Sequence, residues 1–166
     1  MYTHIIWDWN GTILNDSHVA FYCITELLKA EGRKTIDFDY FSRHMTFPLD
    51  QFYVKVGLFD NQSDFLVWEK KYHQLYNEIA KRDSFLHDGV AAIIDQIFKA
   101  GIDQVILSAR EHSALIEEVT HFGLSPYFSK IQGSHPESSY LGKLHYARSV
   151  YRPELGAAIL IGDTLH

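Results

Sequence analysis

A single cysteine, Cys23, stands among the 166 residues of the chain. One cysteine excludes an internal disulfide framework and a cysteine-rich zinc module, and it best fits a reducing compartment, so we expect a cytoplasmic protein. No apolar stretch approaches the roughly 18 residues that a membrane-spanning helix needs. The short apolar run at the amino terminus ends at Asp8, too early for a signal peptide. We therefore expect no association with a membrane.

The chain also lacks a block of basic residues. Its 15 Lys and Arg against 21 Asp and Glu give a net charge of −6. This balance argues against nonspecific binding to nucleic acids or anionic membranes, so a phosphorylated ligand would need a local positive site. Hydrophobic residues make up 46% of the chain and charged residues 22%, which is ordinary for a globular protein. The length of 166 residues is enough for one good core plus a small insertion.

Short apolar runs alternate with segments of helical periodicity along most of the chain. Strands are predicted at residues 5–7, 104–107, 130–131 and 158–161, and helices at residues 17–32, 64–81, 90–101, 115–123 and 141–151. Parallel strands need crossover connections long enough to hold a helix, so this alternation favours parallel pairing. The sequence therefore predicts an α/β fold. Residues 35–82 interrupt the alternation with an aromatic and polar pattern, helical in period over residues 64–81, that we interpret as an insertion of helices.

Three of the predicted strands end in a polar side chain, at Asp8, Ser108 and Asp163. Ligands of open parallel sheets gather at the carboxyl ends of the strands, so these side chains should converge. Two neighbouring carboxylates repel each other unless a cation lies between them, and hard oxygen ligands suit Mg²⁺. Lys143, at the start of a predicted helix, adds a positive charge that can help helix amides to hold an anion. Phosphate is then the natural ligand.

Four segments in order resemble the motifs of the haloacid dehalogenase superfamily: residues 8–14 (DWNGTIL), residues 106–108 (ILS), Lys143 and residues 161–164 (IGDT). The resemblance covers nearly the whole chain, and the insertion is similar to the helical cap of the phosphoglycolate-phosphatase-like branch. It implies a Rossmann-like parallel-sheet core, residues 1–16 and 85–166, with an inserted small α-helical cap domain, residues 17–84. Such a cap would close over the site and gate turnover.

The resemblance also implies a Mg²⁺-dependent phosphatase that acts on a small phosphorylated metabolite. Asp8 would attack phosphorus and form an aspartyl-phosphate, which divides one difficult displacement into two easier steps. Mg²⁺ would be held by Asp8, by the backbone carbonyl of Asn10 and by Asp163. The sequence names neither the metabolite nor the oligomeric state.

Further residues would bind the substrate. Ser108 and Lys143 would hold the phosphoryl oxygens and offset their charge. Gly11 and Thr12 belong to a turn that brings backbone amides toward the phosphate. In the cap, Arg43 is a candidate for the anionic end of the substrate, although an exposed cap charge is the simpler interpretation.

The chain departs from the family pattern at Asn10, where phosphatases of the family usually have a second aspartate. Asparagine cannot exchange a proton at neutral pH, and general acid–base help is worth roughly 10² to 10⁴ in rate. We therefore expect weak hydrolysis, best with good leaving groups. The substitution leaves two alternatives open: a phosphate-ligand binding or regulatory protein without turnover, and cleavage of a phosphonate or a carbon–halogen bond.

A second departure concerns the last motif. The family usually adds a carboxylate four residues after the position of Asp163, and the sequence stops at His166. The strand at residues 158–161 would then lack its usual cover. We expect a core truncated at its carboxyl end, as in a fragment of a longer protein.

Overall fold

The computed structural model describes residues 2–46, 49–58, 65–135 and 142–163, which divide into two units. One unit contains the chain as far as Asn15 and again from Phe85, and the other is Asp16–Ser84. Asp16, placed in the core by the sequence, packs instead with the helical unit. Within the described residues, no helix has the length and apolar character needed to cross a membrane.

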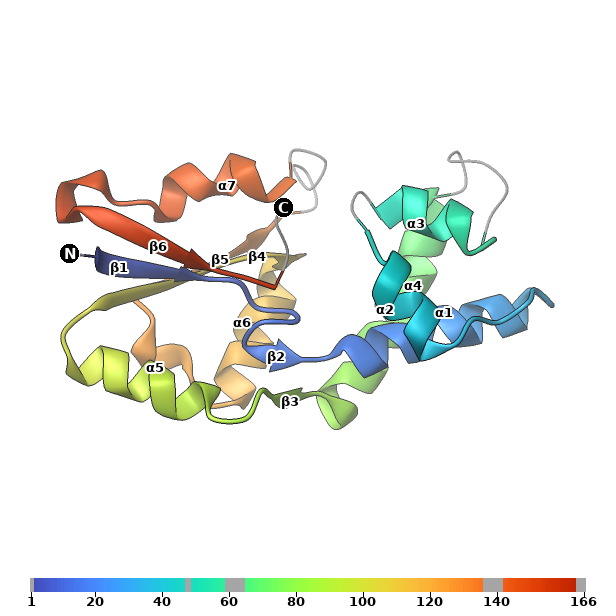
Figure 1. Ribbon diagram of the computed structural model, residues 1–166, viewed down its shortest axis with the longest axis horizontal. Helices are drawn as coiled ribbons and strands as arrows, with labels where there is room; N and C mark the ends of the chain where they lie inside the picture. The colour runs from blue at the N-terminus through green and yellow to red at the C-terminus, as the bar shows by residue number, and fades with distance from the viewer. Residues whose placement is uncertain (1, 47–48, 59–64, 136–141, 164–166) are drawn as a thin grey trace. The chain divides into compact units, whose positions relative to one another are not determined.

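A four-stranded parallel sheet forms the centre of the first unit (Figure 1). Its order is β5 (Lys130–Ser134), β4 (Asp103–Glu111), β1 (Tyr2–Trp7) and β6 (Ala157–Ile161). The register aligns Trp7 of β1 with Ile106 of β4 and with Ile161 of β6, so the three strands reach the same edge together. The predicted α/β class with a Rossmann-like parallel sheet is confirmed.

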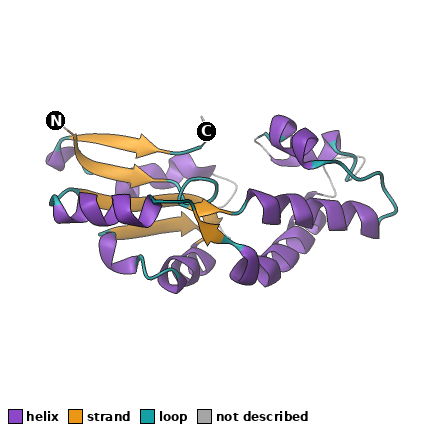
Figure 2. Ribbon diagram, turned by 60° about the horizontal axis from the view of Figure 1, so that its bottom comes forward, coloured by secondary structure: helices purple, strands orange, loops and turns teal. Residues whose placement is uncertain are grey.

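Helices cover both faces of this sheet (Figures 1 and 2). Side chains alternate between the two faces along a strand. In β1, Ile5 and Trp7 pack with α5 (Val90–Lys99) and α6 (His112–His121), while Ile6 packs with α7 (Gly142–Val150). The continuous apolar run of β1 is thus explained by burial on both faces.

Some boundaries differ from the predictions. β4 continues past Leu107 to Glu111, with an irregular register against β5 between these residues. Two short strands, β2 (Leu14–Asn15) and β3 (Phe85–Leu86), pair antiparallel where the chain leaves and re-enters the core. The sequence did not predict them, because a strand of two residues is too short to show a periodicity. Among the described residues, Ser125–Tyr127 and Pro153–Leu155 form 3₁₀ helices. The predicted start of the last helix, Leu141, lies outside the described residues.

Four helices make up the described part of the second unit. They are α1 (Ser17–Ala30), α2 (Phe38–His44), α3 (Leu49–Lys55) and α4 (Phe65–Asp83). One stripe of α1, with Ile24 and Leu28, packs against aromatic residues of α2 and α3. A second stripe of α1 packs against α4. Asp16, just before α1, also accepts a hydrogen bond from the hydroxyl of Tyr76 on α4 at 2.5 Å. The concentration of aromatic residues in the insertion therefore builds a core of its own.

Cys23 lies in the α1–α4 contact and is fully buried. Burial raises the pKa of its thiol to about 12. Because the thiolate is the reactive form, only about one thiol in 10⁴ would be ionised near pH 8. We expect the native protein to resist iodoacetamide at this pH and the guanidinium-unfolded protein to take up one adduct, as measured by intact mass. Rapid alkylation of the folded protein would contradict the packing of this helix pair.

Candidate active site

Asp8 follows directly on the central strand, at the edge where three strands end. Its backbone N–H donates to the carbonyl of Ile161 at 2.8 Å, which joins it to β6. Its carboxylate is mostly buried: Oδ1 accepts the N–H of Trp9 at 2.8 Å, and Oδ2 pairs with the ammonium of Lys143 on α7. The structure therefore brings together two predicted site residues that are 135 positions apart.

The segment after Asp8 turns back on itself. The carbonyl of Trp9 accepts hydrogen bonds from the N–H groups of Thr12, Ile13 and Leu14 at 3.2, 2.9 and 2.9 Å. Gly11 has a φ of 75°, a conformation that other residues adopt at a cost. The turn thus depends on a glycine at this position.

Asp163 follows β6 and lies against this turn. Thr12 Oγ1 donates to Asp163 Oδ1 at 3.3 Å. A Cβ atom on Gly11 would lie 2.7 Å from Asp163 Cγ, closer than any real contact, so the glycine also makes room for the carboxylate. The first and last motifs therefore meet at one edge of the sheet. Thr164, the final residue of the last motif, lies outside the described residues.

Ser108 is buried on β4, two residues beyond the register partner of Trp7. Its Oγ accepts the backbone N–H of Arg110 at 3.1 Å. Because the hydroxyl accepts in this contact, its own proton is still available for an acceptor such as a phosphoryl oxygen. The sheet register puts Ser108 at the same edge as Asp8.

Two other predicted residues are less closely tied to this group. Asn10 is half-buried and forms an isolated bridge with Leu14 within the turn. Arg43 belongs to the helical unit, where its side chain is 71% exposed and pairs with Asp39 at 2.8 Å. Exposed ion pairs contribute little to stability. The role of Arg43 in substrate binding stays a prediction.

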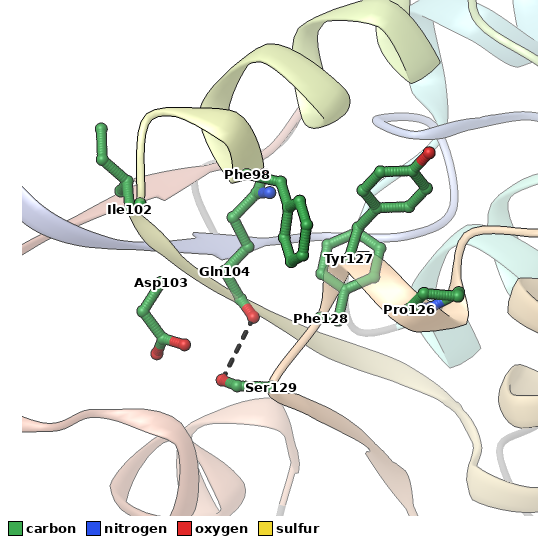
Figure 3. A pocket seen from close by; sticks show the side chains of 9 residues that line it. Phe98, Ile102, Asp103, Gln104, Pro126, Tyr127, Phe128 and Ser129 are labelled. Atoms are coloured by element: carbon green, nitrogen blue, oxygen red, sulfur yellow. Dashed lines mark hydrogen bonds between the residues drawn. The ribbon is translucent and has the colours of Figure 1, made fainter.

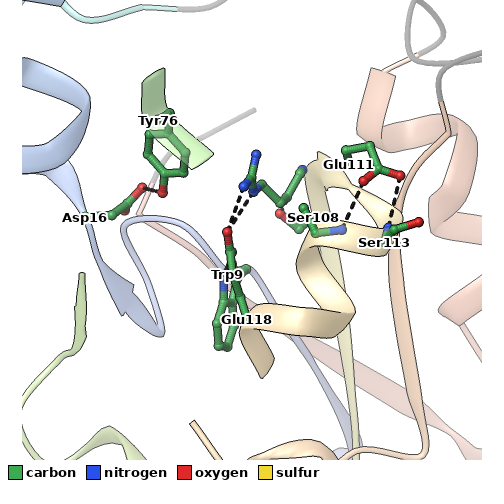
Figure 4. Close-up of polar contacts among 9 residues, drawn as sticks. Trp9, Asp16, Tyr76, Ser108, Glu111, Ser113 and Glu118 are labelled. Atoms are coloured by element: carbon green, nitrogen blue, oxygen red, sulfur yellow. Dashed lines mark hydrogen bonds and ion pairs between the residues drawn. The ribbon is translucent and has the colours of Figure 1, made fainter. Parts of the chain in front are cut away.

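Glu111 ends β4 and caps helix α6 (Figure 4). Its carboxylate accepts the N–H groups of Ser113 and Ala114, each at 3.0 Å. Desolvation acts to raise the pKa of Glu111, but these backbone hydrogen bonds outweigh it and lower the pKa below its usual value. Glu111 therefore stays ionised at neutral pH and stabilises the helix terminus.

A buried polar network beside the site was not among the predicted features. Glu118 of α6 accepts hydrogen bonds from Trp9 and Arg110 (Figure 4). A signal for it does exist, because Glu118 follows Leu115 and precedes Val119 on the apolar stripe of the helix. A carboxylate at such a position indicates a buried partner.

The oxygen donors at the edge suit a magnesium ion. Within the part of the chain that the structure describes, no three His, Cys, Asp or Glu side chains are grouped to hold a metal. The predicted ligand set has only two carboxylates, Asp8 and Asp163, with a backbone oxygen at Asn10. Mg²⁺ usually binds one or two carboxylates and keeps several waters, so the donor chemistry fits this ion.

A shallow cavity of about 300 Å³ lies at the opposite edge, near the amino ends of β4 and β5 (Figure 3). Phe98 and Tyr127 line it together with Gln104. The amide of Gln104 is already engaged: it accepts from the indole of Trp7 at 3.1 Å and donates to the carbonyl of Ile94 at 3.0 Å. A binding site normally has polar groups that converge on the ligand, so this cavity is not our candidate.

The model of the haloacid dehalogenase-like hydrolase family matches residues 5–166. No curated protein is similar in sequence at a significant level.

Several solved structures share the fold. A predicted phosphatase from Clostridium acetobutylicum is 17% identical with a TM-score of 0.78, over 98% of this chain and 76% of that one. A predicted phosphoglycolate phosphatase from Haemophilus somnus is 17% identical with a TM-score of 0.71, over 98% of this chain and 77% of that one. Protein Tyrosine Kinase A of Mycobacterium tuberculosis is 19% identical with a TM-score of 0.80, over 98% of this chain and 75% of that one. At these identities the similarity establishes the fold alone.

Proposed function

Because the chain belongs to the haloacid dehalogenase-like hydrolase family, we propose that it is a Mg²⁺-dependent phosphatase acting on a small phosphorylated metabolite. The observation that carries the proposal is the contact between the Asp8 carboxylate and the Lys143 ammonium at the carboxyl edge of the sheet. A carboxylate at the tip of a central strand is a suitable nucleophile, and the adjacent ammonium is a suitable ligand for the phosphoryl group that it attacks.

The reaction follows from these groups. A carboxylate oxygen of Asp8 forms a bond to phosphorus while the bond from phosphorus to the alcohol oxygen breaks. Lys143 and the Ser108 hydroxyl bind the phosphoryl oxygens and offset their charge as the transition state develops. Water then hydrolyses the aspartyl-phosphate, which releases phosphate and regenerates Asp8.

The Mg²⁺ ligands in this proposal are Asp8, the backbone carbonyl of Asn10 and Asp163. Bound there, the ion would neutralise charge on the phosphoryl group. A carboxylate has about four lone-pair positions, so the contacts of Asp8 with Trp9 and Lys143 leave acceptor positions for other partners.

Asn10 favours a second candidate, a protein that binds a phosphate ester without turning it over. The departing alkoxide needs a proton, and an asparagine side chain cannot supply one. The nucleophile and the anion-binding groups would still retain a ligand. The two candidates differ in whether Asp8 becomes phosphorylated.

Hydrolysis of p-nitrophenyl phosphate tests the proposal, since this ester has a good leaving group. We expect release of p-nitrophenol that requires Mg²⁺, stops on addition of EDTA and returns with excess Mg²⁺. Binding of phosphate esters by calorimetry with no turnover would instead support the binding protein. Metal-independent halide release from a haloacid would support dehalogenation. A panel of phosphorylated metabolites would then identify the substrate class.

A further inference from the structure

Glu118 lies at the centre of a three-residue network that joins three elements (Figure 4). Its Oε1 accepts two hydrogen bonds from the Arg110 guanidinium, from Nε at 3.0 Å and from Nη2 at 2.8 Å. Its Oε2 accepts the indole Nε1–H of Trp9 at 2.8 Å. One carboxylate of α6 therefore holds both the loop after β1 and the end of β4.

The network is largely shielded from water. The side chains of Arg110 and Glu118 are 6% and 11% exposed, and Trp9 is fully buried. A buried charge is costly unless it is paired and hydrogen-bonded. Here the ionised carboxylate matches the guanidinium, and both of its oxygens are used.

Both residues that donate to Glu118, Trp9 and Arg110, also contact a site residue through their backbone. The backbone N–H of Trp9 donates to Asp8 Oδ1 at 2.8 Å, and the backbone N–H of Arg110 donates to Ser108 Oγ at 3.1 Å. A shift of Trp9 or Arg110 would therefore move a hydrogen-bond donor away from the nucleophile or from the phosphate-binding hydroxyl.

The regular pairing of β1 with β4 stops short of these two segments, and the N–H of Asp8 is joined to β6 by its hydrogen bond to Ile161. The register between β1 and β4 extends to Trp7 and Ile106, and pairing of β4 with β5 becomes irregular after Leu107. Asp8 and Ser108 both lie beyond these points. The Glu118 carboxylate connects the two segments where the regular sheet no longer does.

From this geometry we propose that Glu118 is a positioning residue, which fixes Asp8 through Trp9 and Ser108 through Arg110. The inference rests on the proposed phosphatase function for its kinetic consequence. Its structural consequence, a common restraint on two backbone amides, is independent of activity.

Glu118→Gln tests the inference, because glutamine keeps the shape but turns one donor group toward Trp9 or Arg110. We expect kcat for p-nitrophenyl phosphate to fall about 10- to 100-fold, because small misplacements of reacting groups are costly. KM should stay within about two-fold, because Lys143, which lies outside the network, still binds the phosphoryl group. Glu117→Gln, an exposed neighbour on the same helix, is the matched control and should behave as the wild type.

Nuclear magnetic resonance supplies a readout apart from activity. In Glu118→Gln the indole and backbone N–H resonances of Trp9 should both move, whereas in Glu117→Gln neither should. If the wild type hydrolyses no ester, the proposed function fails, and these resonances still decide the inference. The positioning role is overturned if Glu118→Gln folds, keeps the wild-type kcat and shows no movement of the Trp9 backbone resonance.

Trp9→Phe covers the case in which Glu118→Gln does not fold. Phenylalanine keeps an aromatic ring and leaves the Arg110–Glu118 pair intact, but it removes the indole donor. We expect a smaller fall in kcat in the same direction, with KM again retained. A folded Trp9→Phe variant with wild-type kcat would overturn the role of Glu118 at the nucleophile.

Discussion

Asp8→Asn should abolish phosphate-ester hydrolysis, lowering kcat by about 10⁴-fold or more, because no other group in the proposed reaction can form the bond to phosphorus. The neutral amide is a poor nucleophile, and it also removes the charge that faces Lys143. The measurement is the Mg²⁺-dependent rate of p-nitrophenol release, together with the intact mass of protein quenched during turnover. The wild type should carry a phosphoryl adduct that the variant lacks.

The substitution should leave the fold in place. Asparagine is nearly isosteric with aspartate and retains an oxygen that can accept the N–H of Trp9. Asp95→Asn makes the same chemical change on the surface of α5, where Asp95 pairs with Lys99, and it should keep wild-type activity. Turnover by Asp8→Asn within ten-fold of the wild type would mean that another group attacks phosphorus.

The central part of the fold and site was predictable because it depends on local patterns. The short apolar run that ends at Asp8 indicates a buried strand, and the carboxyl ends of parallel strands share one edge. These two rules, with the order of the motifs, were sufficient to bring Asp8, Lys143 and Asp163 into one hypothesis. The contacts of Asp8 with Lys143 and of Thr12 with Asp163 agree with this reasoning.

The partners of Glu118 were not predictable from local patterns. The residues of this network belong to a loop, a strand and a helix, and their contact depends on how α6 docks on the sheet. A sequence pattern reports which side of a helix is buried, but it does not report which residue of another element lies opposite. The extension of β4 to Glu111 has a similar cause, since a register irregularity depends on the neighbouring strand.

Asn10→Asp should raise turnover of esters with poor leaving groups. An alkoxide must be protonated as it departs, and an aspartate two positions after the nucleophile would supply that proton. We expect kcat for alkyl phosphates to rise by up to about 10²- to 10⁴-fold. Hydrolysis of p-nitrophenyl phosphate should change much less, because p-nitrophenolate leaves without protonation. The measurement is the ratio of the two rates in the wild type and the variant.

Asn15→Asp is the matched control for Asn10→Asp, since it makes the same change five positions later, in β2 of the same unit. It adds a negative charge without placing an acid beside the nucleophile, so the ratio of alkyl to aryl turnover should not move. An equal gain on both substrates would assign the effect of Asn10→Asp to the shared hydrolysis of the aspartyl-phosphate or to metal binding, because proton transfer to the leaving group benefits only the alkyl ester. No gain on either substrate would mean that the leaving group already obtains its proton elsewhere, and Asn10 would then not be the cause of weak hydrolysis.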